Sequence, residues 1–153
     1  MTPRCRILGC QILGVFLLLT PIPALASPAV TLASAVYVEH VKERNGTLTR
    51  ALEPAQRVTR GERVVTLLNW YMLGGSGGFT VVNAIPAGLA YQGSADGEED
   101  VSVDGGKTWG KLPQLHVGAR SATPEDVTHV RWHVSPQQAM NGAGHIAYAG
   151  FVR

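Results

Sequence analysis

The sequence predicts an all-β protein, an antiparallel β-sandwich of about seven strands. Short runs rich in Val, Ile, Tyr, Phe and Trp are separated by turn-forming residues roughly every 8–12 positions, which is typical of sandwiches. No stretch of convincing length repeats its apolar residues with the helical period of about 3.6. A small β-barrel is the main alternative, because it would show the same pattern.

The first 26 residues have the features of a secretory signal peptide. Arg4 and Arg6 precede an apolar run at 12–19, and Ala24-Leu25-Ala26 has the small-x-small pattern of a cleavage site. The apolar run is too short to cross a bilayer, which takes about 20 residues. We therefore expect export to the periplasm or beyond, with cleavage near Ala26.

Cleavage changes the composition of the chain that remains. Cys5 and Cys10 leave with the signal peptide, so the mature protein has no disulfide and no thiol nucleophile. Loss of Arg4 and Arg6 reduces the 13 basic residues to 11, which equals the 11 acidic residues, so the mature chain has no net charge with its histidines neutral. This neutral charge argues against a nucleic-acid partner, and no later run is long enough to anchor the chain in a membrane.

We expect residues 27–34 to form a loose lead-in and residues 35–153 to form a single domain. Residues 36–41 read as its first strand, and the Asn45-Gly46 turn should return the chain along 47–52. Residues 63–72 include apolar side chains at both odd and even positions, so both faces of a strand here would be apolar. This pattern indicates a central strand covered on both sides or a bulge.

Further strands follow in the second half of the chain. Residues 127–134 alternate cleanly, with Val130, Trp132 and Val134 on one face and histidines and an arginine on the other. The last strand, at 145–152, is a candidate edge that could accept a strand from a partner. The remaining elements are strands at 79–85 and 89–91 and about one helical turn at 136–141.

The run from Ser102 to Trp109 predicts a tight turn with a strand on each side. Asp104 can fold its carboxylate onto the backbone N–H groups ahead of it, while Gly105 and Gly106 tolerate positive φ. We expect Trp109 to point into the core. The run resembles the Asp box of sialidase-like propellers, but about 127 mature residues cannot form a propeller of four blades. We interpret it as a structural hairpin.

Three stretches, taken in order, resemble the bacterial surface-repeat domain catalogued as domain of unknown function eleven. The resemblance implies an immunoglobulin-like antiparallel β-sandwich that is exported and non-catalytic, and it covers residues 57–153. One difference is Asn83, where the family usually has Asp, and another is the single copy. The stretches are Val81–Tyr91 with its Pro-x-Gly-Leu-x-Tyr corner, the Ser102–Gly106 hairpin, and Pro124–Trp132 with its Arg-Trp strand.

The acidic loop before the hairpin is the best candidate for a metal site. Asp96, Glu98, Asp100 and Asp104 carry the hard oxygens that calcium prefers, but their spacing matches no known calcium loop. A solvated loop is the favoured interpretation, and we expect no cofactor. Among the three tryptophans, Trp109 is the best platform for a glycan if it is exposed.

Catalytic patterns are weak throughout the sequence. No serine lies in the Gly-x-Ser-x-Gly elbow of a hydrolase. His129 and His133 share a strand face but are about 13 Å apart at ~3.3 Å per residue, too far to share one ion. We therefore expect a non-catalytic envelope module with a structural or protein-interaction role, meeting its partner through loops or a sheet edge. Binding of calcium or a glycan is the alternative; the sequence does not indicate an oligomeric state.

Overall fold

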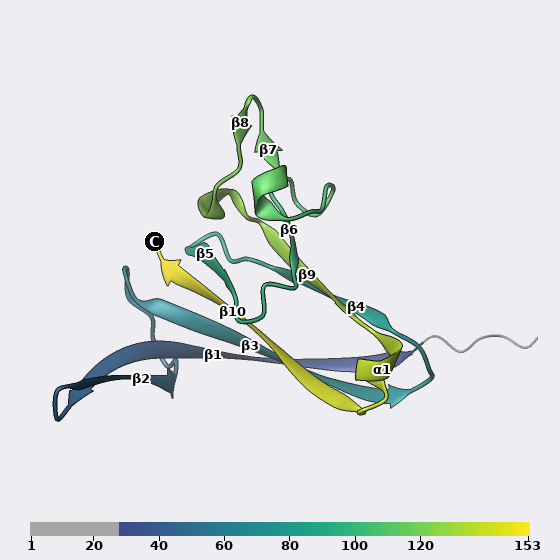
Figure 1. Cartoon of the computed structure of the whole chain (residues 1–153), viewed down its shortest axis with the longest axis horizontal. Helices are drawn as coiled ribbons and strands as arrows, with labels where there is room; N and C mark the ends of the chain where they lie inside the picture. Colours follow the sequence, from purple (N-terminus) through teal and green to yellow (C-terminus); the bar gives the residue numbers. More distant parts are fainter. Residues whose placement is uncertain (1–27) are drawn as a thin grey trace, which may run out of the picture.

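The computed structural model describes residues 28–153, and the predicted signal peptide lies outside this range. The fold is all-β and antiparallel, as predicted, with a five-stranded and a three-stranded sheet that pack face to face (Figure 1). The larger sheet has the order β2 (Thr47–Pro54), β1 (Ala29–Arg44), β3 (Arg63–Gly74), β10 (Ala143–Val152) and β5 (Leu89–Ser94). The smaller has the order β4 (Phe79–Ala84), β9 (His129–Val134) and β6 (Asp100–Ser102).

The remaining elements are short and lie in the connections. They are the strand pair β7 (His116–Val117) and β8 (Arg120–Ser121), the 3₁₀ turns η1 (Leu112–Gln114) and η2 (Pro124–Asp126), and the helical turn α1 (Pro136–Ala139). The ten strands exceed the predicted seven, because β6, β7 and β8 have only two or three residues each. Such short pairs carry no periodic pattern that a sequence could show.

The core lies between the sheets and confirms the alternation predicted for β9. Val130, Trp132 and Val134 are buried, whereas His129, Arg131 and His133 lie on the outer face. The Trp132 ring stacks on Tyr148 of β10, with ring centroids 6.3 Å apart. Asn83 of β4 also joins the sheets, because its Nδ2 donates to the Tyr148 hydroxyl at 2.8 Å.

β3 is the central strand of the larger sheet, as predicted, but the second sheet covers only one of its faces. Val64, Thr66, Leu68 and Trp70 are buried, while the intervening residues are half-buried. The half-buried face looks away from the smaller sheet. In the part of the chain that the structure describes, no helix is long and apolar enough to cross a membrane.

The expected lead-in at 27–34 is wrong for most of its length. β1 begins at Ala29 and pairs with β3 from there through Val38. The segment mixes the strand formers Val30 and Thr31 with Ala and Ser, so its local signal for a strand is weak. The backbone hydrogen bonds to the apolar strand β3 hold it in the sheet.

The Asn45-Gly46 turn is confirmed, with φ angles of 54° and 74° at its two residues. β1 pairs with β3 only as far as Val38, whereas its pairing with β2 runs from Tyr37 to the turn. Residues 39–52 therefore form a two-stranded ribbon, and no third strand from the described residues 28–153 pairs with it. We call this segment the β1–β2 ribbon; Figure 1 shows it at the end of the larger sheet, away from β4, β6 and β9.

The C-terminal strand is not an edge, contrary to expectation. β10 lies between β3 and β5 and pairs with both. The open edges of the larger sheet are β2 and β5 instead. The prediction used the position of the strand at the end of the chain, but strand order within a sheet is set by long-range pairing.

Candidate functional site

The turn after β6 is built as predicted around the Asp104 carboxylate. Its Oδ1 accepts hydrogen bonds from the backbone N–H of Thr108 at 2.9 Å, from the Ser102 hydroxyl at 2.7 Å and from the N–H of Lys107 at 3.0 Å. The N–H of Thr108 and the Ser102 hydroxyl hold the pKa of Asp104 well below its ordinary range. The carboxylate is thus occupied in closing its own loop.

Gly105 and Gly106 have φ angles of 77° and 85°, which other residues rarely adopt. The turn is less regular than the predicted hairpin, because its far side pairs only through a single bridge between Val101 and Gly110. Ser102 is fully buried, and its hydroxyl accepts a hydrogen bond from the N–H of Gly106 at 2.9 Å. The run from Ser102 to Trp109 therefore has a structural role, because its hydrogen bonds fix the conformation of the turn.

Trp109 does not enter the core, contrary to expectation. It is half-buried on the outer face of the smaller sheet, where the Arg131 guanidinium lies 4.7 Å from its ring centroid. The His129 ring meets it edge-on at 6.4 Å. The turn is closed by a single bridge and not by a regular ladder, so the alternation of a regular hairpin does not determine the side on which Trp109 lies. Because Arg131 and His129 already contact the ring, it is a poor platform for a glycan.

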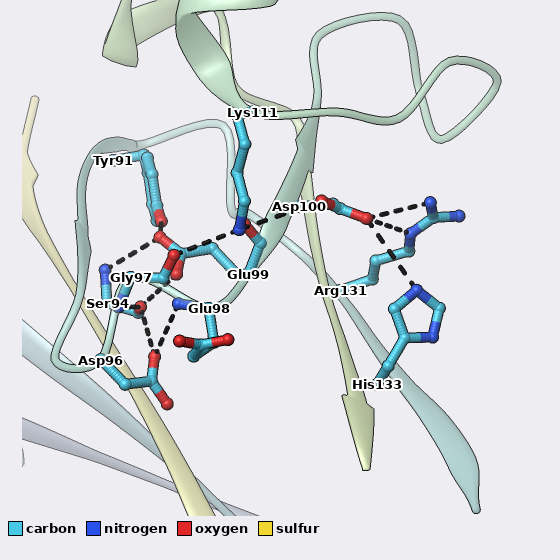
Figure 2. A network of polar contacts seen from close by, with 10 residues as sticks. All are labelled: Tyr91, Ser94, Asp96, Gly97, Glu98, Glu99, Asp100, Lys111, Arg131 and His133. Carbon is cyan, nitrogen blue, oxygen red and sulfur yellow. Dashed lines mark hydrogen bonds and ion pairs between the residues drawn. The ribbon is translucent and has the colours of Figure 1, made fainter. Parts of the chain in front are cut away.

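The loop between β5 and β6 contains a buried carboxylate that the sequence did not single out. Glu99 accepts hydrogen bonds from the Tyr91 hydroxyl and from the hydroxyl and N–H of Ser94 (Figure 2). Burial and the neighbouring Glu99 raise the pKa of Tyr91 far above its ordinary value. Lys111 closes the loop from the other side, where its Nζ donates to the carbonyls of Gly97 and Glu99.

Asp100 is the first residue of β6 and pairs with Arg131 on the outer face of the smaller sheet. Its Oδ2 accepts from Arg131 Nε and Nη2 at 3.2 and 3.1 Å, and Figure 2 shows His133 on the same carboxylate. Arg131 lies between the Asp100 carboxylate and the Trp109 ring. Asp100 is thus part of a surface ion-pair cluster.

The four candidate calcium ligands fall into separate environments. Asp100 is paired with Arg131, Asp104 closes its own turn, and only Asp96 and Glu98 share one side of the acidic loop. Within residues 28–153, no group of three or more His, Cys, Asp or Glu side chains is arranged to hold a metal ion. The geometry therefore gives no support to the calcium alternative.

Asp96 and Glu98 border a pocket of about 570 Å³. Asp96 Oδ1 accepts from the Ser94 hydroxyl at 2.8 Å and from the N–H of Glu98 at 3.2 Å. Desolvation opposes ionisation of Asp96, but these hydrogen bonds outweigh it and lower its pKa, with a smaller contribution from the Trp132 indole. The Glu98 carboxylate accepts no hydrogen bond from any described residue.

Trp132 forms part of the wall of this pocket. It is only 4% exposed, and its indole Nε1 has no hydrogen-bond partner among residues 28–153. The indole therefore lies close enough to the Asp96 carboxylate to lower its pKa, although the two groups are not aligned as a regular hydrogen bond. Sequence analysis identified Trp132 as a core residue, but no sequence signal indicates that its N–H is unpaired.

The sequence matches no protein-family model, no curated protein and no solved structure.

Proposed function

We propose that this chain is an exported, non-catalytic module of the cell envelope, and that it binds a protein partner through the β1–β2 ribbon. The predicted signal peptide supports export, and the resemblance to the surface-repeat domain supports a non-catalytic role in the envelope. The main support for the proposal is the ribbon itself, because an isolated pair of strands is only marginally stable in water.

The side chains of the ribbon support an interaction role. Every residue from 41 to 50 is exposed, including Val41 at 61% and Leu48 at 70%. Leu52 is 51% exposed and lies on the same face, since its partner across the pair is Glu39. A stripe of apolar side chains in water is unfavourable, and burial against a partner would relieve it.

The backbone of β2 offers a second means of binding. A two-residue turn makes Arg44 and Thr47 a hydrogen-bonded pair. Hydrogen-bonded and non-hydrogen-bonded pairs then alternate along an antiparallel ladder, and residues of a non-hydrogen-bonded pair direct their N–H groups away from each other. The N–H groups of Leu48, Arg50 and Leu52 therefore point away from β1, toward the open edge. A partner strand can pair with them while its side chains contact the apolar stripe.

Proline at position 50 tests this mode of binding. Arg50→Pro removes one outward N–H and leaves the β1–β2 ladder intact. Arg50→Ala is the matched control, because both variants lose the ion pair between Arg50 and Glu39, at 3.4 Å. Each tagged protein would be used to recover partners from an envelope fraction, alongside measurements of melting temperature.

We expect wild type and Arg50→Ala to retain the same partner and Arg50→Pro to lose it, with all three melting within a few degrees of one another. The proposal is wrong if the proline variant retains the partner in full, or if wild type recovers none. Recovery of untagged copies of the chain would identify the partner as the protein itself.

A further inference from the structure

The smaller sheet is too narrow to cover the whole inner face of the larger one. Trp70 of β3 meets Phe79 of β4 with ring centroids 5.2 Å apart, so β4 lies over β3. Trp132 of β9 stacks on Tyr148 of β10, so β9 lies over β10. β4 is an edge of its sheet, and no strand from residues 28–153 lies beyond it. The inner face of β1 therefore has no strand of the smaller sheet above it.

Two apolar side chains of β1 are exposed on this inner face. Leu32 and Val36 pair across the sheet with Trp70 and Thr66 of β3, which are both buried between the sheets. Paired residues of neighbouring strands point to the same face of a sheet. Leu32 and Val36 therefore point to the side of the smaller sheet, yet they are 48% and 41% exposed. Ser34, between them on the same face, is also exposed, and we call these three residues the β1 shelf.

The edge strand β4 directs backbone groups toward the space above this shelf. The N–H of Ile85 donates to the carbonyl of Thr128 at 2.8 Å, and this pair continues the register of β4 with β9. Hydrogen-bonded pairs alternate along an antiparallel ladder. The N–H groups of Thr80, Val82 and Ala84 therefore point away from β9, toward the open edge. A further strand can add at this edge, and it would lie over the β1 shelf.

The strand that fits here must carry no second sheet. The edge of another complete sandwich would bring its own second sheet into the place that β1 occupies. The β1–β2 ribbon avoids this collision, because every residue from 41 to 50 is exposed and nothing is packed on either face. Its strand β2 also presents outward N–H groups at Leu48, Arg50 and Leu52. A second copy of the chain therefore offers a suitable strand.

Parallel pairing of β2 with β4 would direct the apolar residues of β2 onto the shelf. In a parallel pair, a residue bonds to the two residues that flank the one opposite to it. Arg50, bonded to the residues on either side of Val81, would lie opposite Val81, whose side chain is buried between the sheets. Leu48 and Leu52, two positions away on either side, would point to the same inner face.

The spacing and the charges of the two surfaces are compatible. Leu48 and Leu52 are about 13 Å apart, as are the two ends of the β1 shelf, because each pair is four residues apart at ~3.3 Å per residue. Arg50 falls over the small, polar middle of the shelf and brings Glu39 of its own copy as an ion-pair partner, at 3.4 Å. With the predicted signal peptide removed, the chain has no net charge, so copies do not repel one another at long range.

We propose that the chain associates head to tail, with β2 of one copy added to β4 of the next and its Leu48 and Leu52 covering the β1 shelf. The proposal rests on the proposed function of the ribbon and names a second copy as its partner. Donor and acceptor are different surfaces, so each copy can use both and a row of copies can grow. A single added strand makes a small interface, so each contact is weak.

Two proline variants separate the donor strand from the acceptor edge. Arg50→Pro removes an outward N–H from β2, and Val82→Pro removes one from β4 without breaking the β4–β9 ladder. Arg50→Ala and Val82→Ala are the matched controls. Sedimentation equilibrium of the mature protein, from micromolar to millimolar concentration, measures association, and melting followed by circular dichroism shows that each variant is folded.

We expect wild type and both alanine variants to associate as concentration rises, and each proline variant to associate about tenfold more weakly or worse, the effect of losing a hydrogen bond. An equimolar mixture of the two proline variants should form a dimer that grows no further, because one supplies an intact β2 and the other an intact β4. The proposal is wrong if wild type stays monomeric, if either proline variant associates like its alanine control, or if the mixture does not dimerise. A monomeric wild type that still recovers an envelope partner through the ribbon would refute self-association alone and leave the proposed function standing.

Discussion

Replacing Glu99 by alanine should destabilise the fold more than any other single change in the acidic loop. Glu99 is 8% exposed and accepts hydrogen bonds from the Tyr91 hydroxyl and from Ser94. In the variant, the Tyr91 hydroxyl and the Ser94 N–H both lose their acceptor, whereas the Ser94 hydroxyl still donates to Asp96. Tyr91 is 3% exposed, so water cannot easily replace the missing oxygen.

The size of the effect follows from these two donors. An unsatisfied buried donor costs about 1–3 kcal/mol, so Glu99→Ala should lower the free energy of unfolding by about 2–5 kcal/mol. For a domain of this size, each kcal/mol shifts the melting temperature by about 3–5 °C. The expected fall is therefore ~6–25 °C, measured by circular dichroism at neutral pH.

Two further variants make the interpretation specific. Glu98→Ala removes the neighbouring carboxylate, which is exposed and accepts no hydrogen bond from the described residues, so its free energy of unfolding should change by no more than about 0.5 kcal/mol. Adding Tyr91→Phe to Glu99→Ala removes the orphaned hydroxyl and should recover part of the lost stability. The reasoning fails if Glu99→Ala melts like Glu98→Ala, or if the double variant melts below the single one.

Three other predictions concern pH and packing. Because burial and Glu99 raise the pKa of Tyr91, the folded state keeps a proton that the unfolded chain releases above about pH 10; the melting temperature should fall above that pH, and by less in Tyr91→Phe. The pKa of Asp104 is lowered instead, so its contribution to stability is present above about pH 4 and is lost on acidification; Asp104→Asn should melt lower than wild type at neutral pH and differ less from it in acid. A Cβ on Gly144 would lie 2.4 Å from the Trp70 ring, so Gly144→Ala should cost about 1–3 kcal/mol of unfolding free energy in a denaturant titration, whereas Gly74→Ala, in open space, should cost less than ~1 kcal/mol.

Features that depend on local sequence were predictable. The Asn45-Gly46 turn needs positive φ at both residues, and that requirement is visible in the residue types themselves. The alternation in β9 shows directly which side chains face the core. The same holds for Asp104, whose carboxylate reaches only a few residues along its own loop.

Features that depend on distant pairing were not predictable. The first residues of β1 are strand because β3 lies beside them, and β10 is internal because β5 pairs with its free side. Burial of Glu99 likewise requires Tyr91, eight residues earlier on another strand. The unpaired Trp132 N–H is a property of the assembled pocket, so no local pattern could indicate it.

Site-specific photo-crosslinking in living cells tests the proposed interaction most directly. A photoreactive residue would replace Leu48 on the β1–β2 ribbon and, as the control, Val117 on β7; both positions are exposed. We predict a discrete crosslinked product from position 48, absent from position 117 and lost when Arg50→Pro is added. No product at position 48, or an equal product at position 117, would contradict the proposed role of the ribbon.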